Sequence, residues 1–452
     1  MIFSELSPEK LVIPGGYKCS CGRVHKCELA FLKIGKGVIR KLPEMLRALG
    51  SEKPFLVCDC NTYEAAGREA ERILQEAGIA YVTYLVPGNH PKPAEWEVGS
   101  ILMHFDPSCD LFLAVGSGVL NDICKVLSKA TGVPNAVVGT APSMDGYASD
   151  SSAMEVNNVK VSLYNHAPRG ILLDTEILAK APMRMLQAGF GDMIAKYVAM
   201  VEWRATWTIN GEYYCEEIAE LMRNALRKVV DAAEGIPARD PDAVGKIAEG
   251  LVLAGIAMAY AGNSRPASGL EHYFSHMWEM MALDRNQPYD LHGIQVGVGT
   301  VLTLKLYEHL KKFTPDPEKA EAHMAAFNPE RWEAEVRRIF GKTAPAILEI
   351  EKKAGKNDPG KHRERLARTL AHWDEIHKAM EEELPDLSEL IRKMRMIGEP
   401  VKPSELGISL RDTVDAFVGS RDLRDKFLTS SLLWDLGEME DYAKILEEEA
   451  EQ

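Results

Sequence analysis

The chain has 452 residues, of which 46% are hydrophobic and 27% charged, and its formal net charge is −14. That length suffices for two domains with substantial cores, and the composition is that of a globular protein. The acidic balance argues against a binder of nucleic acid or of anionic membranes, because both normally carry a basic face. No apolar run of membrane-spanning length is expected, and the first residues lack the pattern of a signal peptide, which predicts a cytoplasmic protein.

Eight cysteines in so long a chain are not expected to form a disulfide framework in the reducing cytoplasm. One group stands out near the N-terminus, made of Cys19, Cys21, His25 and Cys27. These residue types can bind zinc, but a Cys-x-Cys pair is closer than the usual spacing of zinc ligands. The spacing therefore favours an exposed turn ahead of the first sheet strand, with a zinc site as the alternative.

The segment 1–181 alternates short apolar runs with amphipathic helical runs. Strands are expected at Ala30–Ile34, Pro54–Cys58, Ile79–Val86, Asp110–Val115, Asn135–Gly139 and Gly170–Asp174, and helices at Val38–Leu49, Thr62–Ala77, Pro93–His104 and Ile123–Ala130. Helices of crossover length between strands imply parallel pairing in a sheet that is covered on both faces. We therefore expect an α/β domain with a doubly wound parallel sheet at 1–181.

Ligands of such sheets bind beyond the carboxyl ends of the strands, so the residues that follow each strand are the candidates. Asp59 follows the second strand, where it is either a ribose partner or a helix cap. Gly116, Gly118 and Asn121 follow the fourth, where glycines allow a phosphate to approach the backbone and a helix start favours an anion. These glycines do not complete the G-x-G-x-x-G fingerprint, so alone they are weak evidence.

Two further features bear on this candidate site. Asp122 would repel a pyrophosphate unless its carboxylate faces a ribose, a metal or a backbone N–H group. The loop after the fifth strand carries hydroxyl groups and a carboxylate at Thr140, Ser143, Asp145 and Ser149. Such a loop suits a nicotinamide and a substrate, with a plain turn as the alternative. Because three strand ends carry suitable residues, we favour a dinucleotide site.

Beyond residue 181 the pattern becomes helical, and we expect an all-α domain at 182–452. Within it, His272 and His276 are four residues apart and so lie on one face of a helix, and His292 opens the next apolar run. Asp192 lies in an apolar stretch, where an unpaired carboxylate is costly to bury. A divalent cation bound by these side chains is one interpretation; hydrogen-bonded core histidines and a helix-capping Asp are the other.

Several motifs, taken together, resemble those of the glycerol-1-phosphate dehydrogenases. This family belongs to the superfamily of iron-containing alcohol dehydrogenases, glycerol dehydrogenase and dehydroquinate synthase. The motifs are Asp59, Gly116-Ser-Gly-Val-Leu-Asn-Asp122, Thr140-Ala-Pro-Ser-Met-Asp-Gly146, Gly189-Phe-Gly-Asp192, Ser268-Gly-Leu-Glu-His-Tyr-Phe-Ser-His276 and Leu291-His-Gly-Ile-Gln-Val-Gly297. The likeness runs from near Phe31 to near Leu310, with a weaker echo at Leu423–Gly437.

The resemblance implies a dehydroquinate synthase-like fold and the reversible, metal-dependent reduction of dihydroxyacetone phosphate to sn-glycerol 1-phosphate. The implied cofactors are NAD(H) or NADP(H) and one divalent ion of zinc, nickel or iron. Asp192, His272 and His292 would bind the metal, and Asp145 and His276 would contact the substrate. The implied cofactor-binding residues are Asp59, Gly116, Gly118, Asn121, Asp122, Thr140, Ser143 and Ser149.

Alternatives stay open at this point. A polyol dehydrogenase acting on an unphosphorylated alcohol would use almost the same residues, as would a dehydroquinate synthase-like cyclase; a third alternative is a binding protein without catalysis. Arg265 and Lys160 are basic residues that could reach a phosphate, but the sequence does not fix their direction. Asp59 favours NAD over NADP, because a carboxylate repels a 2′-phosphate. A homodimer or higher homo-oligomer is expected, with no nucleic acid or membrane partner.

Overall fold

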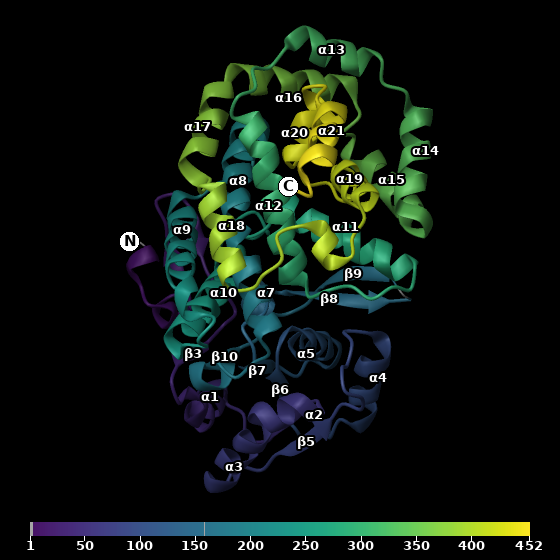
Figure 1. Cartoon of the computed structure of the whole chain (residues 1–452). Coiled ribbons are helices and arrows are strands. Elements are labelled where there is room, and N and C mark those ends of the chain that lie inside the picture. Colours follow the sequence, from purple (N-terminus) through teal and green to yellow (C-terminus); the bar gives the residue numbers. More distant parts are fainter. Residues whose placement is uncertain (1–2, 158) are drawn as a thin grey trace. The chain divides into compact units, whose positions relative to one another are not determined.

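A computed structural model describes residues 3–157 and 159–452 (Figure 1). The chain divides into two compact units. The first extends to Met193 and takes in Cys215–Ser264, and the second consists of Ile194–Tyr214 and Arg265–Gln452. This division reflects which residues pack against one another. The functional boundary near residue 181 stays a prediction.

The first unit is built on a sheet of six strands in the order β3-β10-β7-β6-β4-β5, and every pair in it is parallel. The strands are β3 (Phe31–Gly35), β4 (Pro54–Cys58), β5 (Val82–Leu85), β6 (Leu111–Gly116), β7 (Asn135–Gly139) and β10 (Gly170–Asp174). Each overlaps a run that the sequence predicts, and the four inner strands are buried throughout, as their apolar character requires. The prediction of a doubly wound parallel sheet is confirmed.

Helices and two hairpins complete the first unit. The helices are α1 (Leu42–Leu49), α2 (Cys60–Thr62), α3 (Arg68–Glu76), α4 (Glu95–His104), α5 (Gly118–Thr131), α6 (Thr175–Leu178), α7 (Met183–Ile194), α9 (Glu216–Asp231) and α10 (Pro241–Ala261). Side chains of α1 and α3 pack with alternate residues of the central strands in one hydrophobic core. The remaining residues of β4, β6, β7 and β10 are also buried, on the other face of the sheet.

The sequence predicts neither hairpin. They are β1 (Tyr17–Lys18) with β2 (Val24–His25), and β8 (Ser151–Val156) with β9 (Val159–Tyr164), both antiparallel. The first pair has two-residue strands, too short for a periodic pattern, and β8 mixes buried and exposed side chains without regular alternation. The predicted helix Thr62–Ala77 also differs, since residues Tyr63–Gly67 form a π-helical turn within it.

By length and composition, α10 (Pro241–Ala261) meets the criteria for a membrane-spanning helix, so the expectation that no apolar run reaches that length is wrong. However, 72% of its most apolar 18-residue window is buried inside the protein. It packs on α9 and α6 within the first unit, as a core helix does.

All regular elements of the second unit that lie in the described residues are helical, as predicted. They are α8 (Lys196–Asn210), α11 (Leu270–Asp284), α12 (His292–Leu310), α13 (Pro317–Ala325), α14 (Pro329–Phe340), α15 (Ala344–Ala354), α16 (Pro359–Ala371), α17 (Trp373–Glu383), α18 (Leu387–Met396), α19 (Leu410–Ser420), α20 (Thr429–Asp435) and α21 (Met439–Glu449), with short 3₁₀ turns between some of them. The pair α11 and α12 approaches closely at Gly299, where a Cβ atom would lie 2.5 Å from the Glu271 carbonyl oxygen. Glycine at this position therefore allows the two histidine-bearing helices to pack together.

Candidate active-site residues

The order of the sheet identifies where a ligand of the first unit would bind. From β4 the chain moves outward to β5 and then returns to β6 on the other side of β4. The carboxyl ends of β4 and β6 therefore flank a topological switch point, which is where open α/β sheets bind ligands. Asp59 follows β4 directly, and the Gly116-Ser117-Gly118 turn joins β6 to α5.

Asp59 is the N-cap of α2. Its Oδ1 atom accepts hydrogen bonds from the backbone N–H groups of Asn61, at 2.7 Å, and Thr62, at 2.9 Å. The Thr62 side chain in turn accepts the N–H of Asp59, which completes a capping box. The structure thus shows the capping role, and it fixes the carboxylate at the switch point.

The glycine turn lies at the start of α5. Ser117 is the N-cap residue, its side chain makes no cap hydrogen bond, and the first helical turn carries no acidic side chain. The Ser117 hydroxyl instead lies 2.7 Å from the hydroxyl of Ser143, which comes from the loop after β7. The start of this 14-residue helix thus suits an anionic group.

The carboxylate of Asp122 is paired with a buried cation. Its Oδ1 atom lies 3.0 Å from the ammonium nitrogen of Lys125, which is fully buried, and its Oδ2 accepts the N–H of Ala153. Lys125 also donates to the carbonyl oxygens of Gly146 and Ser151 and to the Ser149 hydroxyl. The carboxylate that could repel a pyrophosphate is thus paired with a cation and a backbone N–H. Sequence reasoning missed Lys125, although its position three residues after Asp122 was a usable signal.

The loop after β7 holds its hydroxyl groups by local hydrogen bonds. The side-chain amide of Asn121 donates to the Gly146 carbonyl oxygen at 3.2 Å, and Ser149 donates to the same oxygen at 3.1 Å. Thr140, which directly follows β7, donates its N–H to the carbonyl oxygen of Gly116 in β6. The predicted cofactor residues from α5 and from this loop therefore form one connected cluster in the first unit.

The two candidate carboxylates of the first unit lie side by side. Asp192 in α7 is fully buried, and its Oδ2 atom accepts the backbone N–H of Asp145 at 2.9 Å. Gly189 allows this approach, because a Cβ atom there would lie 1.9 Å from the Pro142 carbonyl oxygen. The motif Gly189-Phe-Gly-Asp192 thus brings α7 against the Thr140–Ser149 loop.

The three predicted histidines converge in the second unit. The ring centroids of His272 and His292 are 5.4 Å apart, as are those of His276 and His292, and the His272 to His276 distance is 6.4 Å. His272 and His276 come from α11, and His292 opens α12. Imidazoles this close together suit a cation or a polar ligand better than an apolar core.

Buried acceptors orient two of these rings. The Nδ1 atom of His272 lies 2.8 Å from Oε1 of the fully buried Glu271. The Nδ1 atom of His292 lies 3.0 Å from the Ser275 hydroxyl and 3.4 Å from a carboxylate oxygen of Glu279. A proton held on Nδ1 in this way leaves the lone pair on Nε2, which is the arrangement of metal-binding histidines. Sequence reasoning gave Glu271, Ser275 and Glu279 no role. Ser275 and Glu279 follow His272 and His276 by three residues, a spacing that places side chains on one helix face. Glu271 directly precedes His272, and only the structure shows that its carboxylate contacts the ring.

His276 differs from the other two in its electrostatic setting. Burial lowers the pKa of His276 well below its usual value, and the nearby Glu279 carboxylate opposes that shift only in part. The ring is therefore neutral near pH 7, and a neutral imidazole can accept or donate a hydrogen bond to a ligand. His276, Glu279 and His292 also bring ligand atoms within 4.8 Å of one another.

Glu202 is a buried acid whose carboxyl group interacts electrostatically with that of Glu271. Desolvation, and then the charge of Glu271, raise the pKa of Glu202. Its Oε1 atom accepts hydrogen bonds from the backbone N–H of Thr429, at 2.8 Å, and from its hydroxyl, at 2.7 Å. Burial lowers the pKa of Lys426, whose ammonium donates to the carbonyl oxygen of Ser268. These residues hold the start of α11 in place; the sequence alone gave no indication of them.

Arg265 is one of the two basic residues that the sequence suggests could reach a phosphate. It is nearly fully buried, and its Nε and Nη2 atoms each donate to a carboxylate oxygen of Glu212 at 2.7 Å. A third bond goes to the carbonyl oxygen of Phe427. Its guanidinium is thus engaged within the second unit, which favours the structural interpretation for this residue. Lys160 lies in β9 of the first unit.

Comparisons with known proteins agree with these features. The model of the iron-containing alcohol dehydrogenase family matches residues 33–182. A glycerol-1-phosphate dehydrogenase [NAD(P)+] of Halalkalibacterium halodurans is 29% identical, over 90% of this chain and 93% of its own length. The protein of that name from Geobacillus thermodenitrificans is 32% identical, over 70% of this chain and 85% of its own.

The fold is also that of solved dehydrogenases. The crystal structure of glycerol dehydrogenase from Schizosaccharomyces pombe matches with a TM-score of 0.58 and 13% identity, covering 93% of this chain and 91% of that one. At this identity the likeness shows the fold, which confirms the dehydroquinate synthase-like prediction. The sequence relatives go further, and on their evidence this chain belongs to the glycerol-1-phosphate dehydrogenase family.

Proposed function

We propose that this protein catalyses the reversible, metal-dependent reduction of dihydroxyacetone phosphate to sn-glycerol 1-phosphate with NADH or NADPH. The observation that carries the proposal is family membership, because the relatives at 29% and 32% identity bear that name. The histidine cluster of α11 and α12 supports it, since two of its rings are oriented by buried acceptors in the manner of metal ligands. We further propose that the protein works in the cytoplasm, as a homodimer or higher homo-oligomer.

Asp192, His272 and His292 are the proposed metal ligands. Their donor set of two imidazoles and one carboxylate suits zinc, nickel or iron, and it leaves coordination positions open, as a catalytic site needs. The residues fit the role: Asp192 is a fully buried carboxylate, and Glu271 orients the ring of His272. When bound, a divalent cation would supply Lewis-acid stabilisation of negative charge on the substrate oxygen.

The cluster at the end of β6 and β7 is the proposed site for the dinucleotide. The start of α5 attracts the pyrophosphate through its backbone N–H groups, and Asp59 lies at the neighbouring strand end, where it can accept a ribose hydroxyl. Gly116, Gly118, Asn121, Thr140, Ser143 and Ser149 shape this surface. Asp122 contributes indirectly, because its ion pair with Lys125 links α5 to the loop. The bound nicotinamide would supply the hydride.

His276 and Asp145 are the proposed substrate contacts. A neutral His276 can hydrogen-bond the substrate and, in the oxidation direction, accept the proton of its hydroxyl group. In the reducing direction the ring would first take up a proton from solvent and then donate that proton to the oxygen of the reduced carbonyl. The backbone N–H of Asp145 is held by Asp192, which fixes the position of Asp145 in its loop.

The experiment that tests the proposal is a substrate comparison on protein of known metal content. We expect NADH oxidation with dihydroxyacetone phosphate, a much weaker response with unphosphorylated dihydroxyacetone, and sn-glycerol 1-phosphate as the product on a chiral analysis. Because Asp59 disfavours a 2′-phosphate, we expect a lower KM for NADH than for NADPH. Turnover of the unphosphorylated ketone alone would indicate a polyol dehydrogenase. Consumption of the dehydroquinate synthase substrate without a net change in NADH would indicate a cyclase.

A further inference from the structure

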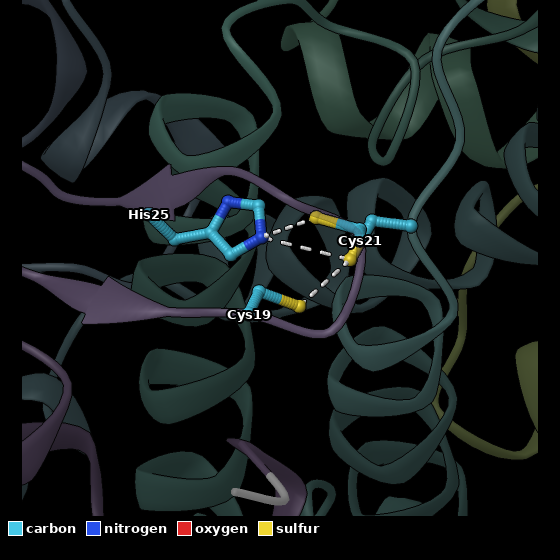
Figure 2. A group of neighbouring side chains, drawn as sticks. Cys19, Cys21 and His25 are labelled. Carbon is cyan, nitrogen blue, oxygen red and sulfur yellow. Dashed lines mark hydrogen bonds between the residues drawn. The ribbon is translucent and has the colours of Figure 1, made fainter.

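A second group of metal-binding side chains lies in the first unit and has no part in the proposed reaction. Its members are Cys19, Cys21 and His25, from the β1–β2 hairpin and its turn, and Cys215, the residue that precedes α9. One ligand atom of each lies within 4.8 Å of every other. Figure 2 shows the three residues of the hairpin with their sulfur atoms and the imidazole pointing toward one another.

The distances in this group match those of a tetrahedral zinc site. Zn–S bonds of about 2.3 Å and Zn–N bonds of about 2.0–2.1 Å place two sulfurs about 3.8 Å apart, and a sulfur and a nitrogen about 3.6 Å apart. Here the sulfurs of Cys19 and Cys215 are 3.7 Å apart. The Nε2 atom of His25 is 3.6 Å from the sulfur of Cys215 and 3.3 Å from that of Cys21.

The imidazole of His25 is held in the orientation that a ligand needs. Its Nδ1 atom lies 2.9 Å from the carbonyl oxygen of Tyr260 in α10, so a proton on Nδ1 leaves the lone pair of Nε2 facing the three sulfurs. The ring is fully buried, stacks on the Tyr260 ring at 5.5 Å and packs against the edge of Phe3. Such a ring cannot turn away easily, which lowers the cost of binding an ion.

Cys215 adds a ligand from a distant part of the chain. As the N-cap residue of α9 it makes no side-chain cap hydrogen bond, and its side chain is buried against the hairpin. The start of this 16-residue helix favours negative charge, which stabilises a thiolate there. Three thiolates close together repel one another, and a divalent cation removes that repulsion.

We propose that Cys19, Cys21, His25 and Cys215 bind one structural Zn²⁺ ion. Three sulfurs and one nitrogen complete its tetrahedral coordination without an open position, so the site is built to stabilise structure and not to activate a substrate. Its effect is to fasten the short β1–β2 hairpin to the start of α9. Binding releases the thiol protons, so the affinity for zinc rises with pH.

Cys27 provides a matched control. It lies in the same segment of the chain, but it is outside the four-residue group. Cys27→Ser should therefore leave zinc binding unchanged, while Cys19→Ser, Cys21→Ser and Cys215→Ser should each weaken it.

The test uses the full chain, purified under reducing conditions with zinc present and without chelator. We expect zinc X-ray absorption to show sulfur neighbours at about 2.3 Å, which the Asp192, His272 and His292 site cannot supply because its ligand atoms are only nitrogen and oxygen. Cobalt(II) replacement should give thiolate-to-cobalt charge-transfer absorption, which a site of Asp and His residues cannot produce. Both readouts come from the unmutated protein, so they do not depend on how the variants fold or on whether the proposed reaction is correct.

The variants then assign the site. The cobalt charge-transfer band should be lost or strongly reduced in the Cys19, Cys21 and Cys215 variants and kept in Cys27→Ser. The proposal is overturned if the unmutated protein shows no sulfur ligation of zinc or cobalt. It is also overturned if mass spectrometry finds Cys19 and Cys215 joined as a disulfide in a separate sample prepared without reductant and with its free thiols alkylated at lysis, or if Cys27→Ser abolishes binding.

Discussion

Replacing His292 by Ala is expected to abolish retention of the catalytic metal and to lower kcat/KM for dihydroxyacetone phosphate by about 10³-fold or more. The size of the decrease in kcat/KM follows from the several kcal/mol by which a Lewis acid stabilises charge in the transition state. Each factor of ten in rate corresponds to about 1.4 kcal/mol. Elemental analysis of the catalytic metal and NADH oxidation measure the two effects. Because the His292 side chain is 25% exposed and not part of the fully buried core, we expect the variant to fold.

His309→Ala is the matched control, because His309 lies on the same helix and pairs with Glu449 far from the cluster in sequence. It should keep both metal and activity. Unchanged metal content in His292→Ala would remove His292 from the ligand set. If the metal were instead lost on replacing Glu279, the group of His276, Glu279 and His292 would be the site.

Replacing His276 by Ala is expected to lower kcat by about 10²–10⁴-fold, the usual contribution of a general acid or base, while the metal content stays unchanged. The reason is that His276 stacks beside His292 at a centroid distance of 5.4 Å but is assigned to the substrate and not to the metal. Steady-state kinetics together with elemental analysis separate the two roles.

Two comparisons make the His276 result specific. NADH binding should be the same in His276→Ala and in the unmutated protein, because the dinucleotide residues lie in the first unit. His276→Gln keeps a hydrogen-bonding side chain without a titratable ring, so it should restore substrate affinity more than turnover. A variant with intact kcat and KM would show that His276 has no part in the reaction.

The fold could be predicted from sequence where the pattern is local. The four inner strands of the parallel sheet are buried on both faces and so form continuous runs with few polar residues, as Pro54–Cys58 does. The β1–β2 and β8–β9 hairpins were missed because their strands are too short or too irregular in burial to show alternation. The packing of α9 and α10 in the first unit depends on tertiary contacts, which an apolar pattern does not identify.

In the candidate site, too, the residues with a local sequence pattern could be predicted and the residues brought in by the fold could not. His272 and His276 were recognisable because four residues is about one helical turn, and His292 follows closely in sequence. Their acceptors were not, since a glutamate beside a histidine is common and only the fold shows that Glu271 is buried against the ring. The group of Cys19, Cys21, His25 and Cys215 shows most clearly what the sequence alone cannot predict. Its fourth ligand, Cys215, is 190 residues from His25, so the hairpin alone favoured a simple turn.

The central claim is that a metal bound by this protein supports the reduction of dihydroxyacetone phosphate. Its most direct test is NADH oxidation with this substrate before chelation, after chelation, and after re-addition of zinc, nickel or iron(II), with metal content measured at each step. The account predicts that chelation abolishes turnover, that at least one of these ions restores it, and that sn-glycerol 1-phosphate is the product. Full activity in protein shown to be free of metal would contradict it.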